Sequence, residues 1–346
     1  MKFVMLRALV KQTKVEYKGQ TAINDSPYED VETSSDYWTV FASKLLEKGW
    51  YDEVEIWYQE NEDHPVQTPH IHSTGLKEIF KPKGYGYSSY EKPIDVLFVR
   101  GDMKEYRPVI DQLSNAFTIY YPSGPYYCPS FVPNLSFVED PIQIDTVKLR
   151  TGSNVELFKK SCVSKYFSTN HYVGKKQWDI AFVCCAPIAE RKRLSLLFKI
   201  LRKLPNVSAV VIGLTDEKLI EEAKELNITW KGWMPRKEMG LVLSRCKIGL
   251  VLSTAEKDGC PRVIMEYLAS GLPIVVSDKT CCSSIYVNRQ TGFVASDEEL
   301  PEAIEECIEI SGFLDIKNYF NTVLSMGCSV RHFAETVKKH NGPINL

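Results

Sequence analysis

The sequence predicts an α/β fold with two domains, each built around a parallel sheet. Its 346 residues exceed what a single hydrophobic core normally supports. Short apolar segments alternate with amphipathic helical segments, which is typical of strands joined by covering helices. The alternation lapses in a polar stretch at residues 168–177 and then restarts. We therefore expect two doubly wound, Rossmann-like domains, over residues 1–172 and 178–312, that face each other across a cleft.

The individual elements follow from hydrophobic periodicity and turn residues. In the first half, a helix is expected to begin after Ser34 and Ser35 and to end at Gly49, and a second one covers 106–114. Strands are expected at 3–10, 54–58, 94–99, 117–121 and 146–149, while residues 59–93 resist assignment. In the second half, strands are expected at 180–184, 207–212, 228–232, 248–252 and 274–276, with helices at 194–203, 217–226 and 238–246. The last segment, 314–339, has its apolar residues on roughly one side and is expected to be mainly helical.

Composition narrows the class of protein. The chain is 44% hydrophobic and 25% charged with a net charge of −2, which is ordinary for a soluble globular protein. No segment is basic enough for nucleic-acid binding, because the cluster at residues 191–193 is short. We expect no signal peptide, and no apolar stretch approaches the roughly 20 residues that cross a bilayer, although peripheral membrane contact stays open. The ten cysteines form no CxxC pair, so we interpret them as buried thiols in a reducing, cytoplasmic compartment.

The segment from Glu256 to Asp278 carries the strongest functional pattern. Asp258 and Glu266 lie on either side of a Gly259-Cys260-Pro261 turn that leads into a helical run. Backbone N–H groups at a helix N-terminus favour an anionic ligand. Paired carboxylates suit acid/base chemistry at a glycosidic bond. Here, however, Asp258 lies in the loop, where it can reach a sugar near a phosphate, and Glu266 lies inside the helix, where it can accept hydrogen bonds from the hydroxyls of a ribose. Taken alone, the two residues fit equally well a helix-capping aspartate and a solvated glutamate.

The same segment resembles the retaining GT-B glycosyltransferases of family 4, whose second domain carries a Glu-x7-Glu motif. Family members read roughly EGxPxxxxEAxAxGxPVVxSD, and this chain reads DGCPRVIMEYLASGLPIVVSD. The departure is Asp258 in place of the first glutamate, which keeps the carboxylate on a shorter arm. The shared positions are Gly259, Pro261, Glu266, Ala269, Gly271, Pro273, Val275, Val276, Ser277 and Asp278. The resemblance extends over about residues 178–312.

This resemblance implies a nucleotide-sugar donor, UDP- or GDP-linked, bound by the second domain without a cofactor or a divalent metal. It implies that Glu266 holds the ribose, and that Asp258 with the Gly259, Cys260 and Pro261 loop holds the sugar and the β-phosphate. Residues 232–235 resemble the segment that faces the base, which makes Trp233 a candidate for base contact. The family's Gly-Arg pair after the first strand of this domain is absent, and Cys184-Cys185-Ala186 stands there. Arg191 and Lys192 are therefore the candidate cations for the departing diphosphate.

The first half of the chain resembles the family only in outline. Arg100 and Asp102 follow a strand, where α/β sites form, and are as well explained by a structural salt bridge. His70 and His72 form an HxH pair with no convincing third ligand, so we expect no metal site. The resemblance implies that the C-terminal helical segment, 313–346, packs back on the first domain.

The function expected from these features is transfer of a hexose, with retention, to a carbohydrate, lipid-linked or protein acceptor. Two alternatives stay open. One is a nucleotide-sugar epimerase of the same fold. The other is a catalytically silent nucleotide-sugar-binding protein.

Overall fold

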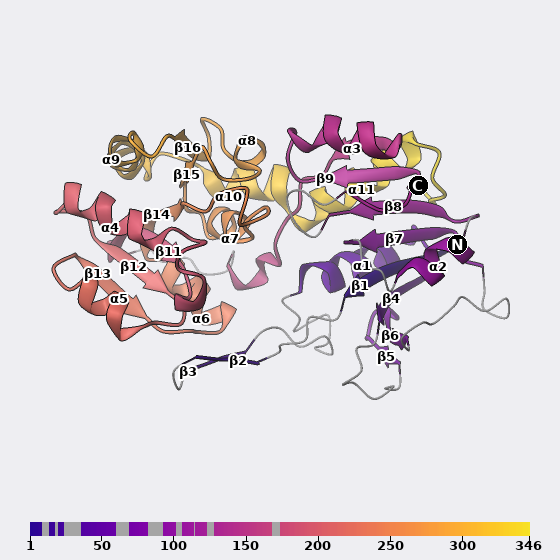
Figure 1. Ribbon diagram of the computed structural model, residues 1–346, viewed down its shortest axis with the longest axis horizontal. Helices are drawn as coiled ribbons and strands as arrows, with labels where there is room; N and C mark the ends of the chain where they lie inside the picture. Colours follow the sequence, from indigo (N-terminus) through magenta and orange to yellow (C-terminus); the bar gives the residue numbers. More distant parts are fainter. Residues whose placement is uncertain are drawn as a thin grey trace. The chain divides into compact units, whose positions relative to one another are not determined.

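The computed structural model describes residues 1–8, 14–17, 20–23, 36–59, 69–81, 93–101, 106–113, 115–122, 128–167 and 174–346. The chain divides into two compact units (Figure 1). The first comprises Met1–Thr13, Asp25–Lys160 and Met326–Leu346, and the second comprises Lys14–Asn24 and Ser161–Ser325. Each unit contains a parallel sheet with helices, which confirms the expected fold class of two Rossmann-like α/β units. The middle segment of the first unit ends at Lys160, and its C-terminal segment begins at Met326.

The sheet of the first unit has the strand order β10-β9-β8-β7-β1-β4-β6-β5. All neighbouring pairs are parallel except β5 with β6. The strands are β1 (Lys2–Ala8), β4 (Glu53–Gln59), β5 (His70–Ile71), β6 (Lys77–Lys81), β7 (Val96–Arg100), β8 (Phe117–Tyr121), β9 (Leu135–Val138) and β10 (Asn154–Leu157). Its helices are α1 (Tyr37–Glu47), α2 (Arg107–Gln112), α3 (Gln143–Thr151) and α11 (Met326–Lys339). The central strands are buried because helices cover both faces of a parallel sheet.

One expectation for this unit is wrong: residues 146–149 belong to the helix α3 and not to a strand. The alternation of Thr146 to Leu149 covers only four residues, and such a short pattern does not distinguish a strand from a helix. Tertiary packing decides it, since Val147 is buried while Leu149 is 88% exposed. Gly152 then ends the helix in the left-handed conformation, with φ of 67°.

The C-terminal helix α11 packs within the first unit (Figure 1, yellow). Phe333 on α11 is fully buried against an aromatic core, and the Tyr37 hydroxyl lies 2.7 Å from Ser329 Oγ. Its aromatic neighbours are Phe3, Phe41, Phe98 and Phe137. Helix α11 is therefore part of the hydrophobic core of the first unit.

A partly buried ion pair lies at the carboxyl end of β1. The Arg7 guanidinium donates to both carboxylate oxygens of Asp36, at 2.5 and 3.1 Å, and Asp36 also caps α1 by accepting from the Thr39 amide. Burial alone would raise the pKa of Asp36, but the Arg7 charge and its hydrogen bonds hold that pKa well below its usual range. Arg100, at the end of β7, lies 5.7 Å from the Trp38 ring. Asp102 lies outside the described residues, so its predicted role is not addressed.

The sheet of the second unit has the order β13-β12-β11-β14-β15-β16, and every neighbouring pair is parallel. The strands are β11 (Trp178–Val183), β12 (Ala209–Ile212), β13 (Ile228–Lys231), β14 (Cys246–Val251), β15 (Ile274–Ser277) and β16 (Gly292–Ala295). The connecting helices are α4 (Leu194–Lys203), α5 (Glu217–Glu222), α6 (Arg236–Leu243), α7 (Val263–Ala269) and α8 (Ser283–Tyr286). After them come α9 (Leu300–Ile310), α10 (Ile316–Tyr319) and a π-helical turn (Phe320–Leu324). The short antiparallel strands β2 (Lys14–Tyr17) and β3 (Gln20–Ile23) also fall in this unit.

The winding of this sheet reverses between β11 and β14. From β11 the chain adds β12 and β13 on one side, and α6 then returns it to the other side for β14, β15 and β16. At such a reversal the loops after the two central strands diverge, which leaves a crevice outside their carboxyl ends. The strand order of the sheet thus indicates where a ligand would bind in this unit.

Helix α7 packs closely against this sheet because a glycine in β14 leaves room for a side chain of the helix. A Cβ placed on Gly249 of β14 would lie 2.3 Å from the fully buried Tyr267 ring. The Tyr267 hydroxyl accepts a hydrogen bond from the Val183 amide at the end of β11. The tyrosine therefore fixes α7, and the residues it carries, relative to both central strands.

Among the residues described, no helix combines the length and apolarity needed to cross a bilayer.

Candidate functional site

The loops that follow β11 and β14 bring Lys192 and Asp258 together. The Lys192 ammonium donates a 2.5 Å hydrogen bond to the Asp258 carboxylate, and each side chain is 15% exposed. Both residues lie at the carboxyl ends of the strands where the winding reverses. The sequence singled out these two residues separately, and tertiary structure makes them a pair. A partly buried cation beside a carboxylate that keeps an oxygen free can hold a phosphate and a sugar hydroxyl together.

The alternative that Asp258 caps the following helix is wrong. The residue at the N-cap of α7 is Arg262, and no side chain caps it. Among the described residues, the backbone amides of Gly259, Arg262 and Val263 have no acceptor in the chain. Because α7 has only seven residues, its dipole is small, and Lys192 is the partly buried cation that pairs with this loop.

The three basic residues 191–193 have three different environments. Arg193 adopts the left-handed conformation, with φ of 56°, where it begins α4. Its guanidinium binds both carboxylate oxygens of Asp297 and donates to the Leu252 carbonyl at 3.3 Å. The hydrogen bonds from Arg193, together with Lys279, lower the pKa of Asp297 to about 2. Arg193 is therefore a structural clamp that ties the start of α4 to β14.

Arg191 is exposed and lines an open hollow of about 370 Å³. Its neighbours there are Pro187, Ile188, Glu190 and Lys257, and the last two form an exposed ion pair. Within the described chain, the ion pairs of Asp258 and Glu266 are made by Lys192 and Arg236 and not by Arg191. Two cations were predicted for the diphosphate. The structure brings Lys192 to the loop of residues 256–261, which carries Asp258 and is called the acidic loop below, and it leaves Arg191 at the surface.

Glu266 is buried rather than solvated, so the alternative of a solvated helix glutamate is wrong. The residue is 5% exposed on α7, and its carboxylate forms an ion pair with Arg236. Arg236 is the first residue of α6 and follows the loop of residues 232–235 that contains the half-buried Trp233. Sequence reasoning missed Arg236. The available signal was its position directly after Pro235, at the end of a loop already assigned to the base.

Two of the ten cysteines form a disulfide, which corrects the expectation that all are thiols. Cys260 of the acidic loop is bonded to Cys282, which precedes α8, and their Cα atoms are 5.5 Å apart. The same two loops are joined by hydrogen bonds from the Ala255 amide to the Lys279 carbonyl and from the Thr280 hydroxyl to the Ser253 carbonyl. Sequence could not pair these residues, because the strand β15 lies between them and only the parallel sheet brings their loops together. The expected reducing compartment stays a prediction, and this disulfide does not support it.

Cys260 and Pro261 are both buried beneath the loop, and Gly259 is half-buried. These residues therefore shape the loop through packing and the disulfide. Their side chains offer little polar contact, so a ligand would meet the Gly259 backbone and the Asp258 and Lys192 side chains.

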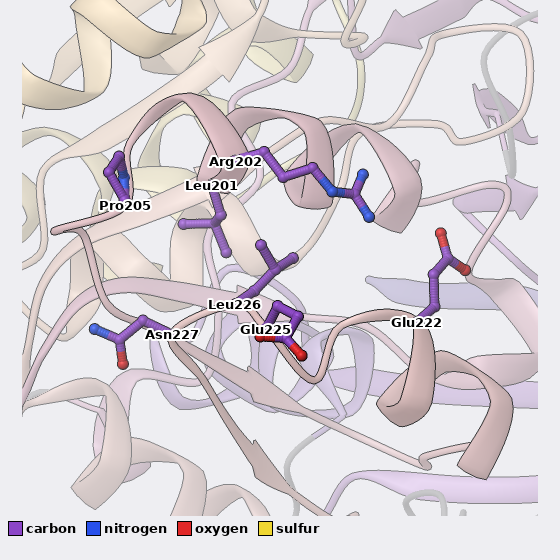
Figure 2. A pocket seen from close by; sticks show the side chains of 7 residues that line it. All are labelled: Leu201, Arg202, Pro205, Glu222, Glu225, Leu226 and Asn227. Atoms are coloured by element: carbon purple, nitrogen blue, oxygen red, sulfur yellow. The ribbon is translucent and has the colours of Figure 1, made fainter.

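A second hollow, of about 410 Å³, lies at the end of the same sheet that is opposite to Lys192 and Asp258, where the strands begin (Figure 2). Its lining comes from the end of α4 and the segments that lead into β12 and β13: Leu201, Arg202, Pro205, Glu222, Glu225, Leu226 and Asn227. Ligands of parallel α/β sheets bind at the carboxyl ends of strands, and this hollow is at the amino ends. We therefore place the candidate site at Lys192, Asp258 and Glu266.

Across the described part of the chain, no group of three or more His, Cys, Asp or Glu side chains is arranged to hold a metal ion. The His70 and His72 rings meet edge to face with centroids 4.5 Å apart, and His72 lies 3.7 Å from Glu78. His72 and Glu78 belong to the interior of the first unit, since both are almost fully buried, whereas His70 is half-buried.

The chain is similar to known glycosyltransferases in one segment of its sequence and in its fold. Residues 173–311 match the model of the family described as Glycosyl transferases group 1. No curated protein sequence matches the chain. Among solved structures, sucrose-phosphate synthase from Thermosynechococcus elongatus is 13% identical, with 98% of each chain covered and a TM-score of 0.69. A glycosyltransferase from Rickettsia africae is 12% identical, with 98% of each covered and a TM-score of 0.67.

The Anabaena protein HepE, solved in complex with UDP and glucose, is 12% identical, with 98% of this chain and all of that one covered, at a TM-score of 0.60. At these identities the likeness shows the fold alone. The fold is that of the GT-B glycosyltransferases, and the segment matched by the family model lies within the unit that contains Lys192, Asp258 and Glu266.

Proposed function

We propose that this protein is a retaining glycosyltransferase that moves a hexose from a nucleoside diphosphate sugar to a hydroxyl acceptor, without a divalent metal. The observation that carries the proposal is the Lys192–Asp258 pair at the winding reversal of the second sheet, within the segment that matches the family model. The retention of configuration and the choice of a hexose rest on the family resemblance. The complex of the Anabaena relative with UDP and glucose supports testing UDP-sugars first.

In this proposal the chain's own residues divide the donor between them. Lys192 donates to the leaving diphosphate while one of its N–H groups stays on Asp258, because an ammonium has three donors. Asp258 then accepts from a hydroxyl of the sugar with its remaining oxygen. Stabilising the charge that develops on the diphosphate is the main catalytic contribution, since that charge is larger in the transition state than in the bound donor.

Glu266 accepts a hydrogen bond from the ribose, and Trp233 lies in the loop proposed to face the base. The acceptor is a carbohydrate, a lipid-linked sugar or a protein, and it is proposed to meet the donor from the first unit. The proposal gives the exposed Arg191 a smaller role than Lys192, limited to the outer part of the phosphate path.

The direct test is donor turnover. The purified protein is incubated with UDP- and GDP-linked hexoses, with and without candidate acceptors and with excess EDTA. Released nucleoside diphosphate is measured, and the anomeric configuration of the product is read by NMR. Release that persists in EDTA, with a retained configuration, supports the proposal.

Each alternative gives a different result in the same assay. A sugar epimerised at C2 supports the epimerase. Measurable donor binding without release, with every acceptor offered, supports the silent binding protein. An inverted product or a complete loss of activity in EDTA contradicts the proposed mechanism.

A further inference from the structure

The ion pair between Arg236 and Glu266 leaves half of the glutamate available to a ligand. Arg236 Nη1 donates to Glu266 Oε1, and no described residue donates to Oε2. The Glu266 side chain is 7% exposed and that of Arg236 is 22% exposed. The carboxylate therefore has one oxygen fixed by the protein and one that is open.

The two residues come from different segments of the sheet's carboxyl edge. Arg236 begins α6 after the loop that follows β13, and Glu266 lies on α7 after the loop that follows β14. A buried carboxylate is costly unless it is paired and hydrogen-bonded. Arg236 accordingly makes the buried position of Glu266 possible and selects the orientation of its carboxylate.

We propose that Arg236 is a positioning residue that sets the preference of this protein for ribonucleotides over 2′-deoxyribonucleotides. The inference rests on the proposed function, because it takes Glu266 as the ligand of the ribose. In this proposal the guanidinium holds Oε1, and Oε2 accepts a hydrogen bond from the 2′-hydroxyl of the bound nucleotide. When the guanidinium is removed, the carboxylate turns among several orientations and this contact is no longer specified.

The pair Lys192–Asp258 already supplies a cation for the diphosphate, and it is a separate pair. A role of Arg236 on phosphate would affect ribose and deoxyribose nucleotides equally. A role on the ribose through Glu266 affects only the nucleotide that carries the 2′-hydroxyl. Nucleotide pairs that differ at this one group therefore separate the two roles.

The experiment measures the dissociation constants of UDP and 2′-deoxy-UDP by calorimetry for the full chain. The variants are Arg236→Gln, Arg236→Lys, Glu266→Gln and the double variant R236Q/E266Q. The matched control is Lys247→Gln. Lys247 forms a 2.8 Å ion pair with Asp179 at the amino ends of β14 and β11, the opposite edge of the same sheet.

For the wild type and the control we expect UDP to bind about tenfold more tightly than 2′-deoxy-UDP, as for a lost hydrogen bond to a charged group. In Arg236→Gln the two constants should agree within about twofold. Arg236→Lys keeps the charge beside Glu266, so it protects folding, but it loses the planar fork and should give an intermediate ratio. Adding R236Q to E266Q should leave the ratio unchanged, because the two residues act through one contact.

The proposal is overturned if Arg236→Gln and Arg236→Lys keep the wild-type ratio of the two dissociation constants. If both constants also rise by the same factor, Arg236 is assigned to phosphate binding or to folding. If the protein binds UDP but releases it from no UDP-sugar donor, the proposed activity fails. The ratio of the dissociation constants of UDP and 2′-deoxy-UDP still tests the role of Arg236. If the wild type binds no nucleotide, both proposals fall.

Discussion

The disulfide between Cys260 and Cys282 should contribute strongly to the stability of the second unit. The perturbation is Cys282→Ala, which removes the crosslink from a buried position. The two cysteines are 22 residues apart, and closing a loop of that length restricts the unfolded chain by about 3 kcal/mol. The matched control is Cys281→Ala, a neighbouring buried cysteine that forms no disulfide, for which we expect a loss of about 1 kcal/mol from lost packing.

The assay is native-state hydrogen exchange read by mass spectrometry on peptides that cover β14 and β15. The slowest amides of these buried strands report the global opening of the unit. A loss of about 3 kcal/mol should make them exchange on the order of 100-fold faster. Adding a reductant to the wild type should produce most of the same change, and the Cys282→Ala variant should be insensitive to it.

The reasoning would be refuted if the wild type exchanged at the same rate with and without reductant, and Cys282→Ala cost no more than Cys281→Ala. The loop that carries Asp258 would then be held by its hydrogen bonds alone.

Three further predictions concern the same unit. Lys192→Gln should lower the turnover number for donor release about 100-fold, as expected for one lost donor to developing charge, while Lys199→Gln on the exposed side of α4 leaves it unchanged in a nucleoside diphosphate assay. Gly249→Ala should lower the unfolding free energy by about 1–3 kcal/mol because a methyl group there overlaps a buried tyrosine ring, whereas Gly312→Ala, which meets no atom within 4 Å, should cost much less; urea titration compares them, and equal losses would contradict the packing argument. The pKa of Asp297 is lowered to about 2 from an ordinary value of 3.8, so its contribution to stability is present above pH 4 and is lost as the pH falls toward 2. The urea midpoint should decline over that range, and Asp297→Asn should decline less.

Much of the architecture could be predicted from the sequence. The βα alternation after residue 178 has the period and loop lengths of a doubly wound sheet, and it predicted five of the six parallel strands; β16 (Gly292–Ala295) was not predicted. The density of family-like positions between Asp258 and Asp278 located the acidic loop and its helix. Such patterns are local, so they are visible in the sequence without knowledge of contacts.

The sequence-based predictions failed in two ways. The strand expected at 146–149 was too short to distinguish from a helix, and packing of Val147 decided it. The pairings Lys192–Asp258, Arg236–Glu266 and Cys260–Cys282 join residues far apart in the chain. Each depends on the strand order, which periodicity does not reveal.

The sequence by itself determined the alternation of buried strands with helices. It also determined which chemical groups are available: the carboxylate in the loop after a buried strand and the short basic cluster. Only the tertiary structure decided how these residues are used. It turned Lys192 toward Asp258, clamped Arg193 on Asp297, left Arg191 in solvent and buried Glu266 against Arg236. The physical reason is that side-chain type is a property of one residue, whereas burial and pairing are set by which strands lie side by side in the folded sheet.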